Sequence, residues 1–141
     1  MIWKKDFNIE SLNSNNGFFG EYQNPFDIEF TEKGDSHLIC KMEVTPKTKQ
    51  PMGLLHGGVS VYLAETIGSY AANLCLESEN KAAVGLDINA NHIKGIKSGF
   101  VFAKAKPIHL GGKTQVWSIE ITNEKDEMIC VSRLTMAVVS I

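Results

Sequence analysis

The sequence has few cysteines and histidines and no excess of either charge, and these shortages exclude several classes of protein. Cys40, Cys75 and Cys130 are odd in number, far apart and outside any CxxC pair, which argues against a disulfide framework and indicates a reducing compartment. The four histidines form no HxH or HExxH motif, so no metal site is expected. The 14 basic and 16 acidic residues are spread along the chain, so nucleic-acid binding is not expected either.

Long apolar runs are also absent. The N-terminal stretch MIWKKDFNIESL has two lysines and then alternates polar and apolar residues, so it lacks the continuous apolar core of a signal peptide. No segment approaches the roughly 18 uninterrupted apolar residues that a membrane span needs. The sequence therefore predicts no membrane partner, and the cytoplasm is the expected location.

What the chain does have is apolar content sufficient for one core. Its 141 residues are 43% hydrophobic, and the length is too short for two ordinary domains, so we expect one domain over residues 1–141. A short helical start around residues 7–12 precedes a Gly- and Asn-rich break at residues 13–17. A hairpin follows, and the two prolines of residues 45–52 end it.

The longest apolar segment runs from Gly57 to about Ser78 without a proline, and it predicts one helix of about 22 residues that is buried on most sides. Such a helix needs a sheet wrapped around it. Six strand-like runs supply one, at residues 26–30, 38–44, 84–92, 99–107, 114–122 and 129–138. Because no long crossover separates consecutive strands, the sheet should be mostly antiparallel, and the predicted fold class is α+β.

The start of this helix lacks the residue types that usually cap one. Ser, Thr, Asp or Asn normally accepts a hydrogen bond from the first backbone N–H groups, whereas the sequence here reads Leu55, His56, Gly57, Gly58. With no local side-chain acceptor and no Cβ to exclude a ligand, the first amides suit negative charge, as in an oxyanion hole. A second interpretation stays open, in which the glycines only let the helix approach another backbone closely.

One carboxylate lies in the middle of the apolar helix. Glu65 and Ser69 are one turn apart and share a helix face with Gly58, Tyr62 and Ala72. Among apolar neighbours the Glu65 carboxylate is poorly placed for solvent, and functional sites are where such an arrangement tends to persist. The alternative is a buried glutamate with a purely structural role and satisfied hydrogen bonds.

The spacing of Gly57 and Glu65 limits how they can act together. They are eight residues apart, which is roughly 12 Å along a helix axis, whereas a reacting carbonyl lies ~3 Å from both its oxyanion donor and its nucleophile or base. Two antiparallel helices from two copies of the chain meet this condition, each pairing its own Gly57 with the other's Glu65. The sequence therefore predicts an obligate homodimer with two sites at the interface.

Four segments of the chain match one enzyme family, and together they cover most of the sequence after residue 48. They are QPMGLLHGGVSVYLAETIGS, VGLDINANHI, PIHLGGKTQVWSIEI and SRLTMAV. HGG alone is a weak signal, but HGG followed by AE, NANH and HLG is specific. On these segments the chain resembles the hotdog-fold acyl-CoA thioesterases of the PaaI-like, phenylacetate-catabolism branch. The start MIWKK resembles the subgroup that hydrolyses 1,4-dihydroxy-2-naphthoyl-CoA and other aromatic acyl-CoAs.

The resemblance implies a hotdog fold, dimers joined edge to edge and usually a homotetramer. It implies that Glu65 attacks the thioester carbonyl or activates water, and that the N–H of the partner subunit's Gly57 polarises the carbonyl oxygen. Gln50 matches a glutamine near the thioester, His56 a histidine that shapes the site, and Ser69 a residue that positions the attacking water or the carboxylate. From the residues alone, Gln50 could equally stabilise its loop and His56 could be a turn histidine. Coenzyme A belongs to the substrate, so no cofactor is expected.

Contacts to the acyl group or the coenzyme A nucleotide are also implied by the resemblance. His92 and Lys94 follow the NAN segment, and Gly112 and Lys113 follow HLG. Position 113 carries arginine in many relatives, and position 112 would be serine in a close one. Lysine offers a phosphate a point charge without the bidentate fork of arginine, and lysines at such a rim could otherwise be solvated charges.

The acyl pocket itself is expected to combine side chains from two subunits, among them Met52, Tyr62 and Tyr70. The resemblance favours naphthoyl or benzoyl groups, and the sequence does not separate a nucleophilic from a general-base role for the carboxylate.

Two other functions compete with hydrolysis. A hotdog domain that binds acyl-CoA without turnover would act as a sensor, but the retained Glu65 and the lack of an appended DNA-binding segment argue against it. A hotdog dehydratase acting on hydroxyacyl thioesters would carry a proline-rich histidine motif, whereas glycines follow His56 here.

Overall fold

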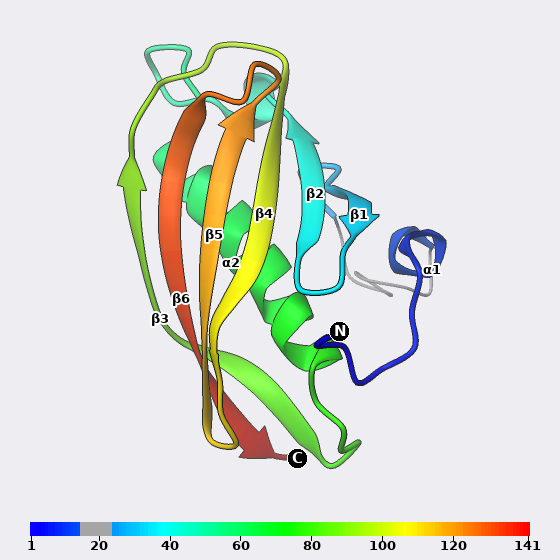
Figure 1. The fold of residues 1–141 in the computed structure, drawn as a ribbon. Coiled ribbons are helices and arrows are strands. Elements are labelled where there is room, and N and C mark those ends of the chain that lie inside the picture. Colours follow the sequence, from blue (N-terminus) through cyan, green and yellow to red (C-terminus); the bar gives the residue numbers. More distant parts are fainter. Residues whose placement is uncertain (15–23) are drawn as a thin grey trace.

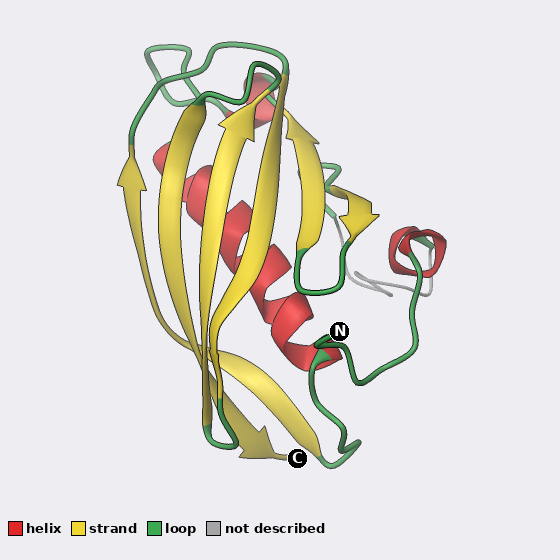
Figure 2. Ribbon diagram, viewed as in Figure 1, coloured by secondary structure: helices red, strands yellow, loops and turns green. Residues whose placement is uncertain are grey.

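One long helix lies across a six-stranded sheet in the computed structural model (Figures 1 and 2), which describes residues 1–14 and 24–141. The sheet curls around helix α2 (Gly57–Leu74), and the N-terminal segment lies beside the end of that helix. The remaining elements are α1 (Ile9–Asn13), β1 (Glu29–Lys33), β2 (Leu38–Glu43), the 3-10 turn η1 (Pro46–Thr48), β3 (Lys81–His92), β4 (Phe100–Leu110), β5 (Thr114–Asn123) and β6 (Met128–Ser140).

The strands are arranged in the order β1-β2-β4-β5-β6-β3, and every neighbouring pair is antiparallel. The predicted α+β class is confirmed, and so are the six predicted strands. The short helical start is confirmed as α1, whereas most of the predicted break at 13–17 lies outside the described residues. Strands β1 and β3 form the two edges of the sheet.

The core lies between α2 and the concave face of the sheet. Trp117, Ile119 and Ile121 of β5 are fully buried and alternate with outward residues, as the sequence pattern predicts. Each such side chain contributes about 1.5–3 kcal/mol of burial free energy. The indole Nε1 of Trp117 donates to Gln115 Oε1 at 2.9 Å, so the one polar atom of this side chain is satisfied inside the core.

Two predictions about the long helix are wrong. It ends at Leu74 rather than near Ser78, because the Cys75 N–H closes the last turn and the amides of Lys4 and Lys5 bind the Leu74 carbonyl. It is also buried on one face only: the buried positions recur at spacings of three and four along the side that meets the sheet. The opposite side, which carries Glu65, is half-buried in a single chain.

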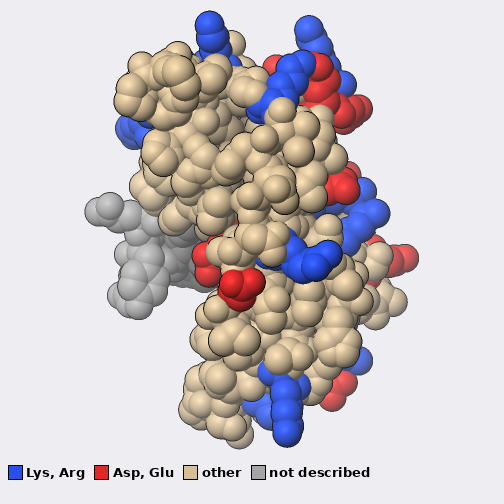
Figure 3. All heavy atoms as spheres, turned by 90° about the vertical axis from the view of Figure 1, so that its left-hand side faces the viewer, with Lys and Arg blue, Asp and Glu red and all other residues tan. Residues whose placement is uncertain are grey.

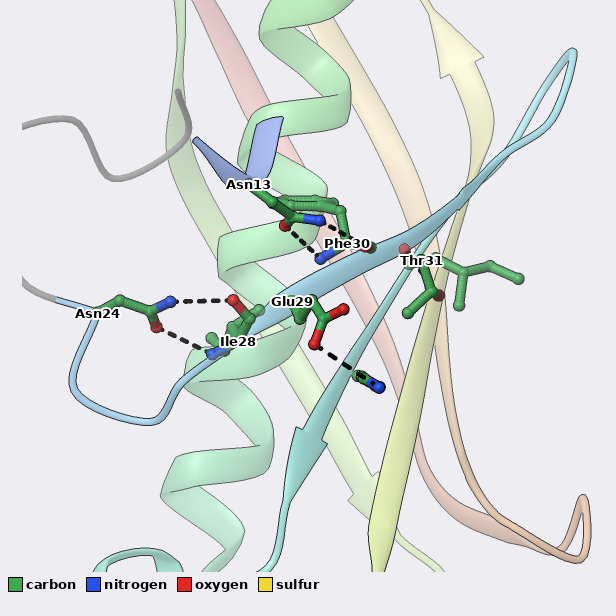
Figure 4. Close-up of polar contacts among 8 residues, drawn as sticks. Asn13, Asn24, Ile28, Glu29, Phe30 and Thr31 are labelled. Atoms are coloured by element: carbon green, nitrogen blue, oxygen red, sulfur yellow. Dashed lines mark hydrogen bonds and ion pairs between the residues drawn. The ribbon is translucent and has the colours of Figure 1, made fainter. Parts of the chain in front are cut away.

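Asparagine side chains form hydrogen bonds with the backbone of edge strand β1 and of the residue that precedes it (Figure 4). Asn13 accepts from the Phe30 N–H and donates to the Phe30 carbonyl, both at 2.8 Å, and Asn24 binds both backbone groups of Ile28 in the same way. An ion pair between Glu29 and Lys41, 3.6 Å apart, joins β1 to β2. Side chains thus take the place of a further strand at this edge.

In edge strand β3 an asparagine side chain from the described part of the chain binds the backbone in this way only near the beginning of the strand. The carboxamide of Asn73, in the last turn of α2, binds the N–H and the carbonyl of Ala83, both at 2.9 Å. Beyond Ala83 no described strand covers the outer side of β3. Figure 3, which views this side of the molecule, shows that most of its surface carries no charged side chain. No helix of the described residues is long and apolar enough to cross a membrane.

Candidate active site

The N-terminus of α2 is capped by a histidine. Nδ1 of His56 accepts a hydrogen bond from the Gly58 N–H at 2.9 Å. The prediction that the first amides lack a local side-chain acceptor is therefore wrong for Gly58. Because Nδ1 is the acceptor, the neutral ring carries its proton on Nε2. His56 is thus a turn histidine whose ring is held in one tautomer at the start of the helix.

The Gly57 amide remains open. Its N–H has no hydrogen-bond acceptor among the residues that the structure describes. Gly57 lines a hollow of about 290 Å³ together with Gln50, His92 and Lys94. Four of the predicted site residues are therefore brought together around one unpaired N–H at a helix N-terminus, where negative charge is stabilised.

Gln50 stabilises its loop, as one of its two interpretations predicts, and its role near the thioester stays a prediction. Its backbone N–H donates to the Leu54 carbonyl at 2.8 Å, and its side-chain Oε1 accepts from the Met52 N–H. The carboxamide oxygen is thus used to fix the turn that precedes α2. The Nε2 group is left to donate to a ligand in the hollow that Gln50 lines.

His92 lies at the end of β3 against the start of α2. A Cβ on Gly57 would lie 2.8 Å from His92 Nε2, so only glycine fits without displacing the ring. The close neighbour of Gly57 is thus a side chain rather than the other backbone that the second interpretation expects, and the oxyanion role of its amide stays a prediction.

Lys94, also at this rim, is not a free charge in the single chain. Its ammonium group is paired with the Glu127 carboxylate, which Asn123 also contacts at 3.1 Å. The hydrogen bonds from Lys94 and then Asn123 hold the pKa of Glu127 below its ordinary value. The pair ties the loop after β3 to the turn between β5 and β6.

Glu65 lies elsewhere. Its carboxylate makes no hydrogen bond or ion pair with any described residue, and the residue is half-buried, so it is not a structurally satisfied glutamate. A Cβ on Gly85 of β3 would lie 2.5 Å from Glu65 Oε1. Ser69, one turn further along α2, is half-buried beside β3, and its carbonyl accepts from Asn73 at 2.9 Å.

Gly57 and Glu65 thus meet the same edge strand at different positions. Gly57 contacts His92, and Glu65 contacts Gly85, seven residues earlier. An extended strand of this length spans roughly 20 Å. Both residues lie in the single helix α2, eight residues apart, so the predicted spacing of roughly 12 Å along the helix axis holds within one chain.

Gly112 and Lys113 do not join the hollow at Gly57. They lie at the turn between β4 and β5, at the opposite end of the molecule from the start of α2 (Figure 1), and Gly112 lines a separate hollow of about 380 Å³. The Lys113 carbonyl accepts from the Val138 N–H at 2.9 Å. Within one chain, the two predicted nucleotide-binding pairs are therefore not brought together.

The predicted acyl-pocket residues have mixed positions. Met52 is 75% exposed. Tyr62 packs edge-on against Phe26, with ring centroids 5.2 Å apart. Tyr70 packs against Phe30, with centroids 6.0 Å apart, and burial raises its pKa. None of the three predicted residues lines the hollow at Gly57.

Sequence reasoning passed over Ser60, which is buried and lines the hollow. The available signal was its place one turn after Gly57 on the same helix face. The cysteines offer no alternative nucleophile: burial raises the pKa of Cys75 to about 12, and those of Cys40 and Cys130 are also raised. The described part of the chain contains no cluster of three or more His, Cys, Asp or Glu residues suited to a metal.

The sequence profile of the thioesterase superfamily matches residues 52–130, which is more than half of the chain. The chain belongs to the thioesterase superfamily. It is 50% identical to the 1,4-dihydroxy-2-naphthoyl-CoA hydrolase of Escherichia coli over 138 residues, covering 98% of this chain and 99% of that protein. The described architecture is the hotdog fold of these enzymes.

Solved structures of thioesterases agree. One from Haemophilus influenzae is 49% identical, with a TM-score of 0.86 over 99% of this chain and 96% of its own. A mutant thioesterase from Pseudomonas aeruginosa is 40% identical, with a TM-score of 0.92 and complete coverage of both chains. The enzyme prediction is confirmed, and the chain is a thioester hydrolase.

Proposed function

We propose that this thioesterase hydrolyses acyl-CoA thioesters, with aromatic acyl groups of the naphthoyl or benzoyl type preferred, at two sites shared by two copies of the chain. Support for the acyl-CoA class comes from the Escherichia coli relative, whose name specifies a naphthoyl-CoA substrate and which matches nearly the whole chain. Coenzyme A arrives as part of the substrate, so the proposed reaction uses no cofactor.

The observation that carries the proposal is the separation of two unpaired groups. The Gly57 N–H is open at one hollow, and the Glu65 carboxylate is open some distance away along β3. An oxyanion donor and a nucleophile that serve one carbonyl lie ~3 Å from it. A second copy of the chain supplies the missing group to each site.

The free edge of β3 offers the geometry for this pairing. The Asn73 side chain binds the backbone N–H and carbonyl of Ala83, so the outer backbone groups of residues 84–92 can pair with a strand of a second copy. Two antiparallel copies of this stretch meet around a two-fold axis at Ile88 or Asn89. His92 of one copy then lies beside residues 84–86 of the other, which include Gly85, the contact of Glu65. The hollow at Gly57 is thereby placed next to the partner's Glu65.

Two chemical routes fit this arrangement. In the nucleophilic route an oxygen of Glu65 bonds to the carbonyl carbon, the C–S bond breaks, and the thiolate leaves and takes up a proton. Water then opens the mixed anhydride, which releases the acid and restores the carboxylate. In the general-base route Glu65 takes a proton from the water that attacks the carbonyl carbon, the C–S bond breaks, and the departing thiolate takes up the proton, which restores the carboxylate. In both routes the partner's Gly57 N–H stabilises the negative carbonyl oxygen, with Gln50 Nε2 as a second donor.

Several large apolar side chains near this edge are bare in a single chain. Met52 is 75% exposed, Leu86 65% and Ile93 60%. Exposed apolar surface of this kind suits an interface or a ligand site. A partner subunit and an aryl group would cover it, which supports a role for Met52 at the acyl pocket. Tyr62 and Tyr70, which pack against Phe26 and Phe30, stay predicted residues of that pocket.

The nucleotide contacts follow from the same pairing. In this pairing, Lys94 of one copy would lie opposite residues near the partner's Ala83. Within the partner, Ala83 pairs with Val138, and the Val138 N–H donates a hydrogen bond to the Lys113 carbonyl. Strands are about 4.8 Å apart, so the partner's Lys113 lies roughly 10 Å behind the edge. Lys94, His92, Gly112 and Lys113 would thus border one site. The homotetramer that the resemblance implies stays a prediction.

Thiol release from aryl, short-chain and long-chain acyl-CoAs tests the proposal. We expect the highest kcat/KM for naphthoyl-CoA or benzoyl-CoA, and a fall in kcat of about 10²–10⁴-fold for Glu65→Gln with folding unchanged. Glu120→Gln, an exposed carboxylate on the other face of the sheet, is the matched control and should keep the normal rate. A preference for aliphatic chains would contradict the aromatic assignment, and normal turnover by Glu65→Gln would contradict the catalytic one. Labelled oxygen from water enters Glu65 in a single turnover only by the anhydride route.

A further inference from the structure

We infer that Gly85, in edge strand β3, is a positioning residue for the reactive carboxylate of Glu65; this inference rests on the proposed function. A Cβ at position 85 would lie 2.5 Å from Glu65 Oε1 and 3.6 Å from Glu65 Cδ, and apart from the adjacent residues 84 and 86 no other described residue has an atom within 4 Å of it. Real Cβ atoms do not approach an oxygen so closely. The carboxylate therefore lies where the side chain of any other residue would be.

The φ angle of Gly85 gives no separate reason for a glycine here. Among the described glycines only Gly53 and Gly99 have a positive φ, so any residue could adopt the conformation of Gly85. Glycine inside a strand weakens it and commonly marks a close approach by another group. At this position the approaching group is the Glu65 side chain.

The strand behind the carboxylate is held in place from two sides. Asn73 binds both backbone groups of Ala83, two residues before Gly85. Gly85 itself pairs with buried Met136 of β6, and a bulge follows it, where Leu86 has no pairing partner. Since the strand is fixed and the Glu65 side chain is flexible, an added methyl group should displace the carboxylate and leave the strand in place.

A double-mutant cycle separates positioning from a general effect on the strand. Gly85→Ala should lower kcat about 10- to 100-fold with KM nearly unchanged, because a displacement of about 1 Å at the reacting group can cost 10²-fold. Glu65→Asp carries a carboxylate one methylene shorter, which no longer reaches position 85. On that slower background, Gly85→Ala should change kcat by less than about 2-fold, since the cycle reports the pairwise contact alone.

The matched control is Gly34→Ala in the hairpin between β1 and β2. Its Cβ would also meet a flexible side chain, the ring of His37 at 2.1 Å, but far from the site. Normal kcat and KM are expected for this variant.

The outcomes of the double-mutant cycle either support or contradict a positioning role for Gly85. Equal losses from Gly85→Ala in both backgrounds, or no loss in either, would overturn the inference. If Gly85→Ala folds only when Glu65 is shortened, the contact is supported; if it folds in neither background, the strand and not the carboxylate needs the glycine. Normal rates for Glu65→Asp and Glu65→Gln would instead contradict the proposed function, whatever Gly85→Ala does.

Discussion

Strand β1, at one edge of the sheet, has five residues and a bulge, and asparagine side chains bind the backbone at Phe30 and at Ile28 just before it. Strand β3, at the other edge, has twelve residues and also a bulge, and among the described residues an asparagine binds its backbone only at Ala83. Short and covered edges are among the ways in which proteins avoid pairing with other chains, so length and covering distinguish the two strands. A long edge strand whose backbone is mostly uncovered is suited to pairing with another chain. Strand β1 is therefore protected from such pairing, and strand β3 is available for it.

The side chains of the two edges differ in the same sense. Strand β1 (EFTEK) has three charged residues out of five, whereas β3 has two out of twelve, Lys81 and Asp87. Val84 and Leu86 of β3 are 46% and 65% exposed. Burying charge without a partner is costly, whereas burying apolar surface stabilises association. These differences support our proposal that a dimer interface, with the two proposed sites, lies on β3.

The largest effect is expected from like charges placed on strand β3, in contrast to the same charges placed on strand β1. The variant Asp87→Lys/Asn89→Lys, here called the basic edge, places like charges opposite each other at the proposed two-fold axis. We expect a monomer by light scattering and a loss of activity of at least about 10²-fold, because each site then lacks its oxyanion donor or its carboxylate. Glu29→Lys/Thr31→Lys makes the same charge change on β1 and should leave the mass and the activity unchanged.

A second variant makes this test reversible. Asn89→Asp, the acidic edge, repels its own copy through residues 87 and 89, but it complements the basic edge. Mixing the two monomeric variants should restore the dimer and the activity together. A dimer that persists in the basic edge, or one lost in the β1 control, would move the interface away from β3.

A smaller effect is expected from the asparagines that bind the strand backbone. Asn13→Ala and Asn73→Ala each remove two hydrogen bonds to one strand residue, at Phe30 and Ala83 respectively. Each change should lower the free energy of unfolding by about 1–3 kcal/mol, measured by denaturant unfolding. Only Asn73→Ala should also lower kcat, by about 10-fold, because β3 carries the contact of Glu65. Equal kcat values for the two variants would show that the edges do not differ in this way.

The fold could be predicted from the sequence because its strands alternate clearly and the long helix lacks proline. The end of α2 could not, because Leu74 is capped by backbone amides of Lys4 and Lys5, which are distant in sequence. The cap at its start was missed for another reason. Imidazole is not among the usual capping groups, so the sequence HGG gave no sign that His56 would accept from Gly58.

Of the candidate site, the separation of Gly57 and Glu65 could be predicted because helix rise is nearly constant. Their neighbours could not, since the contacts to His92 and Gly85 depend on how β3 crosses the helix. The pairing of Lys94 with Glu127 depends in the same way on which loops the sheet brings together. The periodicity of the sequence predicts which residues share one face of a helix or strand. Which of these faces pack together depends on the three-dimensional fold.

We propose that each site takes Gly57 from one copy and Glu65 from the other, and a forced heterodimer distinguishes this arrangement from a site within one chain. One chain carries the basic edge with Glu65→Gln, and the other carries the acidic edge with Gly57→Pro. Proline is accepted at the first position of a helix, and His56 already has the extended backbone that precedes proline (φ −66°, ψ 129°), so this change removes the N–H and keeps the start of the helix. Its Cβ also displaces the His92 ring of the same chain, but only at the site that this substitution is meant to disable. The heterodimer should show about half the activity of the same pair without the site substitutions, since one of its two sites is intact. Activity no higher than that of either chain alone would contradict shared sites.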